Sequence, residues 1–151
     1  MKKFFPALLA GATLLAVLSQ AAMAQAPGAI KDGAQMTREI AAQVRNISTD
    51  ELRREIATNP ELVLIDIRTP DEVAGMGGAI SAPQNVNIPR GWLEFRVTQI
   101  ARNRNTPIVV YCGGNIRSPL AAHTLQQMGY TNVRNYADGY IGWKQRGLPS
   151  R

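Results

Sequence analysis

The stretch TPIVVYCGGNIRSPLAAHTLQQMGY, residues 106–130, holds the only cysteine of the chain between a strand pattern and a helix pattern. Residues 106–112 are rich in apolar and β-branched side chains, which predicts a strand covered on both faces. A helix pattern follows, with Ser118 expected as its N-cap and Pro119 at its first position. The stretch therefore predicts a strand that places Cys112 at the start of a strand-to-helix loop.

Strand and helix patterns alternate over most of the chain on either side of this stretch. A capping box at Thr69 and Glu72, with Pro70 between them, starts a helix directly after a strand pattern. Residues 36–47 indicate a helix that leads into a short strand. The other expected strands cover residues 61–68, 86–89 and 132–136, and the other expected helices cover residues 50–57, 92–103 and 118–130. Residues 139–149 are expected to form a closing helix and turn. This alternation predicts an α/β domain with a largely parallel sheet, whose site lies beyond the carboxyl ends of the strands.

The loop after Cys112 has the composition of an anion-binding loop. Its two glycines allow successive backbone N–H groups to point into one concavity, and the positive end of the helix dipole lies close by. Arg117 adds a full positive charge. Such surroundings stabilise a thiolate and lower the pKa of a cysteine, which indicates a reactive residue. The alternative interpretation is an unreactive buried cysteine followed by an ordinary turn. We favour the reactive cysteine, with a binding loop made of Gly113, Gly114, Asn115, Ile116, Arg117 and Ser118.

This half of the chain resembles the active-site half of the rhodanese family, in which a strand, a cysteine and a short loop ending in Arg-Ser precede a helix. LIDIRTPDE at 64–72 and VNIPRGWLEF at 86–95 resemble two further segments of that family, so that the similarity runs from about Ile47 to Pro149. The resemblance implies a three-layer α/β fold with a five-stranded, mostly parallel sheet and helices on both faces.

The resemblance also implies sulfur transfer without a cofactor. Cys112 would attack the outer sulfur of a small anionic donor such as thiosulfate and hold that sulfur as a persulfide. Cyanide or a thiol, including a protein thiol, would then accept the sulfur. The alternative is a rhodanese module that binds or carries sulfur for a protein partner without turnover. The family's more frequent residues at positions 115 and 116 are Gly and a basic residue, so that Asn115 and Ile116 bear on donor preference.

A phosphatase is the nearest alternative reaction. Cysteine phosphatases on this fold place an arginine six positions after the cysteine, whereas Arg117 lies five positions after Cys112. The shorter loop is the one associated with sulfurtransferases, and we therefore favour sulfur transfer over phosphate chemistry.

Two other polar positions invite functional interpretations. Asp66 and Arg68 lie two residues apart at a strand end and so share a face. Either Arg68 lies near the mouth of the site and binds anions, or the two residues form a structural ion pair, which we favour. His123 lies inside the helix after the loop, and we expect its ring to point away from Cys112. With a single histidine and a single cysteine at this separation, we expect no metal site.

The N-terminus has the pattern of a secretory signal peptide over residues 1–24. Lys2 and Lys3 precede an apolar run that is shorter than the roughly 20 residues of a membrane-spanning helix, and Ala22-Met23-Ala24 fits signal peptidase. We expect cleavage after Ala24, a periplasmic protein, a lead-in segment over residues 25–46 and a rhodanese domain over residues 47–151.

The charge and the cysteine content limit which partners and which oligomeric state we expect. The chain has 17 basic and 11 acidic side chains, a net charge of +6, which falls to +4 without Lys2 and Lys3. The arginines are scattered along the chain, whereas a nucleic-acid binder would cluster them, so that we expect no nucleic acid as partner. We also expect no membrane attachment after cleavage, and a monomer. A lone cysteine cannot form an intramolecular disulfide, so that Cys112 is a candidate for a reactive thiol or an intermolecular link.

Overall fold

The computed structural model of the chain describes residue 28 and residues 30–151. The predicted signal peptide and residues 25–27 of the lead-in lie outside the described residues. The chain divides into the units Met1–Ile30 and Lys31–Arg151, and the second unit contains the sheet and its helices. This unit starts ahead of the boundary predicted at residue 47. Within the described residues, no helix is long and apolar enough to cross a membrane.

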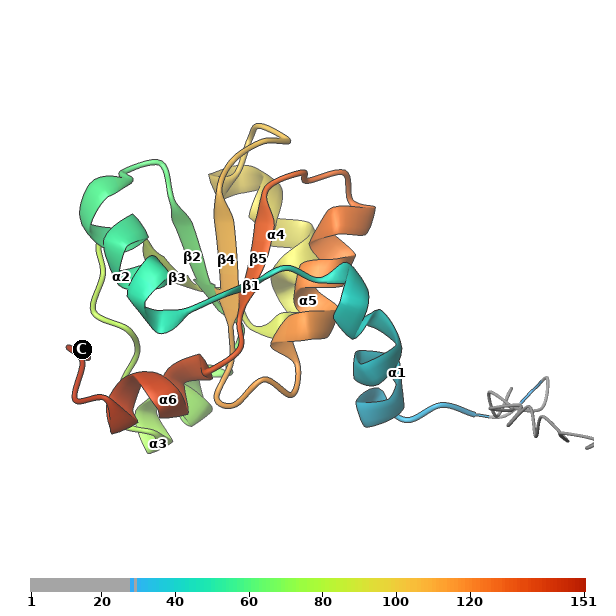
Figure 1. Ribbon diagram of the computed structural model, residues 1–151, viewed down its shortest axis with the longest axis horizontal. Helices are drawn as coiled ribbons and strands as arrows, with labels where there is room; N and C mark the ends of the chain where they lie inside the picture. The colour runs from blue at the N-terminus through green and yellow to red at the C-terminus, as the bar shows by residue number, and fades with distance from the viewer. Residues whose placement is uncertain (1–27, 29) are drawn as a thin grey trace, which may run out of the picture. The chain divides into compact units, whose positions relative to one another are not determined.

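A five-stranded sheet lies at the centre of this unit (Figure 1). Its order is β1-β5-β4-β2-β3, and every pairing between neighbouring strands is parallel. β4 is the central strand, and all of its residues are buried, as expected for a parallel strand covered on both faces. The strands are β1 (Asn46–Ile47), β2 (Val63–Asp66), β3 (Asn85–Asn87), β4 (Ile108–Tyr111) and β5 (Val133–Tyr136).

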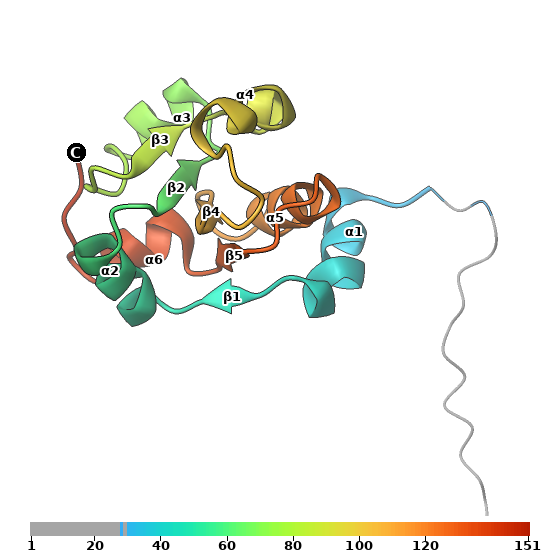
Figure 2. The same ribbon diagram turned by 90° about the horizontal axis from the view of Figure 1, so that it is seen from above.

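Helices cover both faces of the sheet, which confirms the predicted three-layer architecture. Figure 2 shows α2 and α6 on one side of the strands and α4 and α5 on the other, with α1 beside α5. Two short 3-10 helices, η1 (Ala41–Gln43) and η2 (Arg90–Trp92), complete the connections. The helices are α1 (Gly33–Ile40), α2 (Thr49–Thr58), α3 (Pro70–Gly75), α4 (Leu93–Ile100), α5 (Ser118–Gln127) and α6 (Gly139–Gln145).

Two hydrophobic clusters fill the space between the layers, and β4 contributes to both in strict alternation. Ile108 and Val110 belong to the cluster under α4 and α5, whereas Val109 and Tyr111 belong to the cluster under α2 and α6. Cys112 continues this alternation and joins the α4/α5 cluster. The side-chain period of the strand therefore decides which face of the sheet carries the sulfur.

Local sequence signals account for the ends of several helices. The capping box predicted at Thr69 and Glu72 is present at α3, and Ser48 and Glu51 form another at α2. A closing helix and turn are predicted over residues 139–149, and in the structure α6 ends at Gln145 and Gly147 has a left-handed φ of 65°. Glycine adopts that conformation without a steric penalty, which favours the end of the helix.

Candidate active site

Cys112 directly follows β4 and lies under the first turn of α5. The residue is only 1% exposed, and its thiol donates to Ser118 Oγ at 3.6 Å. Ser118 was predicted as the N-cap of α5, and this prediction is wrong. Arg117 occupies the N-cap position without a side-chain cap, and Ser118 is the first residue of the helix. The hydroxyl of Ser118 contacts the sulfur, which explains why it does not cap the helix.

The sulfur lies in a cradle of backbone N–H groups. Burial raises the pKa of the Cys112 thiol, but hydrogen bonds from the N–H groups of Arg117, Ser118 and Gly114 and from the Ser118 hydroxyl outweigh this effect. The net result is a pKa below the ordinary value for cysteine. The N–H groups that stabilise the thiolate can equally hold the negative terminal sulfur of a persulfide.

The N-terminus of α6 holds the outer side of this loop. The N–H groups of Tyr140 and Ile141 donate to the carbonyl oxygens of Cys112 and Gly113, both at 2.9 Å. Gly139 has a φ of 61°, and a Cβ added there would lie 2.6 Å from the Gly113 oxygen. Only glycine allows this close approach, so that α6 binds the loop carbonyls while the N–H groups further along the loop face the sulfur.

The left-handed residue of the cysteine loop is not one of its two glycines. Neither Gly113 nor Gly114 has a positive φ, whereas Asn115, with a φ of 61°, is the only non-glycine residue in the described part of the chain that does. The ends of two neighbouring side chains lie close to these glycines. A Cβ at Gly113 would lie 3.4 Å from Met76 Cε, and one at Gly114 would lie 3.4 Å from Ile141 Cδ1.

Arg117 forms a bidentate ion pair with Glu72 of α3. Its Nη1 and Nη2 atoms donate to the two carboxylate oxygens at 2.9 and 2.5 Å. These bonds, together with the donation from the Thr69 N–H, lower the pKa of Glu72 to about 2. Glu72 was missed as a site residue, although its place in a capping box showed that its carboxylate lies at a helix start. The pair offsets the charge of Arg117 beside the cysteine loop.

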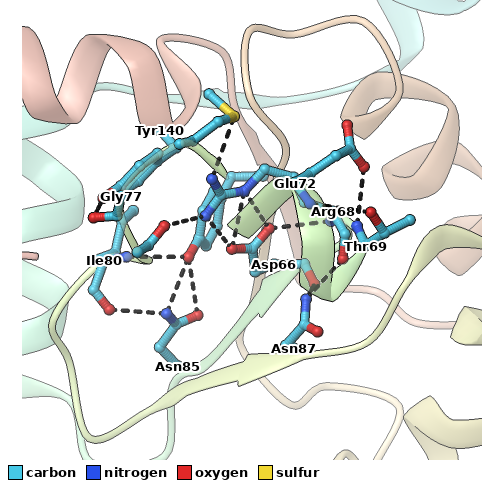
Figure 3. A network of polar contacts seen from close by, with 12 residues as sticks. Asp66, Arg68, Thr69, Glu72, Gly77, Ile80, Asn85, Asn87 and Tyr140 are labelled. Atoms are coloured by element: carbon cyan, nitrogen blue, oxygen red, sulfur yellow. Dashed lines mark hydrogen bonds and ion pairs between the residues drawn. The ribbon is translucent and has the colours of Figure 1, made fainter. Parts of the chain in front are cut away.

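Arg68 lies in a buried network of polar contacts (Figure 3). Its side chain is 0% exposed, and its guanidinium donates to both carboxylate oxygens of Asp66 and to the Gly78 carbonyl. It also stacks over the Tyr140 ring, 4.1 Å from the centroid. Leu64, which shares the face of Asp66 and Arg68 in the alternation, belongs to the α2/α6 cluster, opposite the face that carries Cys112. This is the structural ion pair, not an anion site at the mouth.

The outer rim of the loop is apolar. The Ile116 side chain is 74% exposed and that of Ile141 is 46% exposed. His123 lines a cavity of about 440 Å³ between α1 and α5, which Arg117 and Leu120 also line. Within the described residues, no three His, Cys, Asp or Glu side chains gather as metal ligands.

Comparisons with known proteins agree with this geometry. The model of the rhodanese-like domain family matches residues 48–146. A sulfurtransferase from Allochromatium vinosum is 35% identical over 107 residues, which cover 70% of this chain and 94% of that protein. The structure of a polysulfide-sulfur transferase homodimer from Wolinella succinogenes matches with a TM-score of 0.68 and 29% identity, over 77% of this chain and 84% of that one.

A second solved structure carries a different name. It is a protein of unknown function from Rhodopseudomonas palustris, named as a possible tyrosine phosphatase, with a TM-score of 0.72 and 28% identity over 84% of this chain and 100% of that one. The family match covers most of the described unit, from the start of α2 to the end of α6, and includes the cysteine loop. The chain therefore belongs to the rhodanese-like family of sulfurtransferase domains.

Proposed function

We propose that this protein transfers a sulfane sulfur from a small anionic donor such as thiosulfate to a thiophilic acceptor through a persulfide on Cys112. One observation carries the proposal: a single buried thiol with a lowered pKa lies in a cradle of backbone N–H groups at the carboxyl end of β4. The cradle suits a sulfur that is negative both before and after it takes up a second sulfur.

The two steps balance without an external oxidant or reductant. The Cys112 thiolate attacks the outer sulfur of thiosulfate and forms a new S–S bond, while the bond to the central sulfur breaks and its electron pair leaves with sulfite. Cyanide or a thiolate then attacks the outer sulfur of the persulfide. The S–S bond breaks, its electron pair returns to Cys112, and the product is thiocyanate or an acceptor persulfide.

Thiocyanate production from thiosulfate and cyanide tests the complete cycle. The wild-type protein should produce thiocyanate catalytically, and Cys112→Ser should reduce the rate to that of the solution without protein. Equal rates for the two proteins would contradict the proposal. Turnover of a generic aryl phosphate that is lost in Cys112→Ser would instead support the phosphatase alternative.

A sulfur carrier is the second candidate, and the exposed Ile116 side chain favours it because an apolar rim suits a protein acceptor better than cyanide. Intact mass after incubation with thiosulfate alone separates the two. A gain of one sulfur atom on Cys112 without thiocyanate turnover would indicate a carrier. No gain in mass and no turnover would contradict both candidates.

We further propose that the protein is exported, cleaved after Ala24 and active as a periplasmic monomer. The basic start, the short apolar run and the Ala22-Met23-Ala24 site support this proposal. The intact mass of protein recovered from the periplasm should correspond to a chain that begins at Gln25, and light scattering should give the mass of one chain. An uncleaved N-terminus or a dimer mass would overturn the corresponding part.

A further inference from the structure

Three asparagine side chains connect the cysteine loop to the edge of the sheet. The side-chain amide of Asn135 in β5 donates to Asn115 Oδ1 in the loop at 2.9 Å. The same amide nitrogen donates to Asn46 Oδ1 in the edge strand β1 at 2.8 Å. Asn46 and Asn135 are register partners in the sheet. The pairing of β1 with β5 therefore fixes the hydrogen bond between these two side chains, which we call the outer link.

Asn135 is a costly residue at its position. It is 1% exposed and lies in register beside Val110, which belongs to the α4/α5 cluster that also contains Cys112. Its amide nitrogen serves both neighbouring asparagines, but its Oδ1 atom is buried and has no hydrogen-bond partner among the described residues. A buried carbonyl oxygen without a hydrogen-bond partner destabilises the folded state. Stability alone would favour an apolar side chain there, which points to a role in the loop.

Asn115 is the residue of the loop whose backbone is in the left-handed conformation. Its φ of 61° lies in the left-handed region, which L residues other than glycine, asparagine and aspartate rarely adopt. A single left-handed residue among right-handed ones gathers neighbouring N–H groups into a concavity. The N–H groups of Gly114, Arg117 and Ser118, on either side of Asn115, are the ones that bond to the sulfur. The conformation of Asn115 therefore determines the shape of the cradle.

We propose that Asn135 is a positioning residue for the reaction at Cys112: it fixes Asn115 in the left-handed conformation that shapes the cradle, and Asn46 fixes Asn135. The hydrogen bond from Asn135 replaces the freedom that a glycine at position 115 would have with a defined loop geometry. The proposal deepens the proposed function, because its effect on rate presupposes that Cys112 is the nucleophile.

The experiment compares Asn115→Gly, Asn135→Ala and the double variant. The pH dependence of Cys112 alkylation by iodoacetamide reports the thiolate directly, and thiocyanate assays give kcat and KM. Each single substitution should move the alkylation midpoint to higher pH and slow alkylation at pH 7 roughly threefold or more, with a loss in kcat rather than KM. Because Asn135 acts through Asn115, the double variant should be no slower than the slower single variant.

Asn87→Ala is the matched control. Its side-chain amide also donates twice, to the carbonyl oxygens of Asp66 and Arg68, but it does not contact the cysteine loop. It should lower stability and leave the alkylation midpoint unchanged. Should Asn135→Ala fail to fold, Asn46→Ala tests the outer link from an exposed position and should shift the midpoint in the same direction.

The outcomes separate this inference from the proposed function, because alkylation needs no sulfur donor. Shifted midpoints in a protein that makes no thiocyanate would leave Asn135 as a positioning residue and overturn the sulfur-transfer cycle. Thiocyanate turnover with unchanged midpoints would overturn the role of Asn135. Effects of Asn115→Gly and Asn135→Ala that multiply in the double variant would also overturn it, since each residue would then act independently.

Discussion

At the scale of single residues, the acidity of Cys112 comes from hydrogen bonds and not from a neighbouring free charge. The thiol is almost fully buried, which by itself would favour its neutral form. Arg117, the nearest candidate cation, is paired with Glu72. The N–H groups of the loop and the hydroxyl of Ser118 therefore carry the stabilisation of the thiolate.

The variant Ser118→Ala tests whether hydrogen bonds stabilise the thiolate, because it removes a single donor, the Ser118 hydroxyl. When Cys112 is a thiolate, the Ser118 hydroxyl becomes the donor in this hydrogen bond, so that its removal should raise the pKa of Cys112 and lower the thiolate fraction at pH 7. We expect iodoacetamide alkylation at pH 7 to slow roughly threefold to tenfold, since a hydrogen bond to a charged group is among the stronger ones. Above the pKa of both proteins, the rates should converge. Ser48→Ala, at the N-cap of α2, should destabilise the fold without this effect.

At the scale of elements, the cysteine loop is held by two helices that lie far from it in sequence. α6 binds the loop carbonyls through its first N–H groups, and α3 supplies Glu72 to Arg117 at the start of α5. The carboxylate of Glu72 also accepts from the Thr69 N–H in the capping box. One side chain thus joins the start of α3 to the start of α5.

Glu72→Gln isolates the charge in this contact, because glutamine also suits the capping box. The pKa of Glu72 is lowered in the folded state to about 2, from 4.5. Its contribution to stability is therefore complete above about pH 4.5 and is lost as the pH falls towards 2. The half-exposed pair should contribute below about 1 kcal/mol. Urea unfolding should show a wild-type advantage at pH 7 that shrinks below pH 4.5, and an advantage independent of pH would contradict this account.

The helices and strands also show which features of the fold and the site can be predicted from the sequence. Apolar runs and capping boxes predicted the parallel sheet, the position of Cys112 and the start of α3, because these signals are local. The partners of the site are not local: Glu72 lies 45 residues from Arg117, and Asn135 lies 20 residues from Asn115. Only the strand order places such residues side by side.

The position of Arg68 shows the same limit. Alternation along β2 assigns Asp66 and Arg68 to one face, and alternation along β4 assigns Cys112 to one face. The sequence does not say that these are opposite faces, because that depends on the pairing of Asp66 with Tyr111. The prediction that Ser118 caps α5 was wrong for a related reason. Its hydroxyl has two possible partners, the helix N-terminus and the sulfur, and the loop geometry selects the sulfur.

At the scale of the whole molecule, the last residues tie the α6 side to the segment before β3. Ala79 and Arg151 exchange two backbone hydrogen bonds, at 2.8 and 3.0 Å. The Pro149 carbonyl accepts from the Ser81 N–H at 3.1 Å and from Trp143 Nε1 at 2.8 Å. Trp143 is 3% exposed, so that its indole N–H depends on this acceptor.

Deletion of residues 149–151 should therefore destabilise the whole unit. The indole N–H of Trp143 and two backbone N–H groups lose their acceptors, which should lower the free energy of unfolding by roughly 1–3 kcal/mol. Urea unfolding followed by tryptophan fluorescence measures the effect. Ser150→Ala keeps the backbone contacts and should leave the midpoint within experimental error. A deletion variant as stable as the wild type would show that the segment makes no net contribution.

The hydrogen bonds between α6 and the cysteine loop also have a consequence for protein design. Both contacts, Tyr140 to Cys112 and Ile141 to Gly113, run from backbone to backbone. The frame of the loop therefore does not depend on the side chain at position 116, which points outward and is largely exposed. A saturation library at Ile116 could change the charge and shape presented to incoming donors while the sulfur stays in place. The scaffold thus offers a fixed thiolate beside a position that can be varied freely, a convenient starting point for selecting new thiol-transfer specificities.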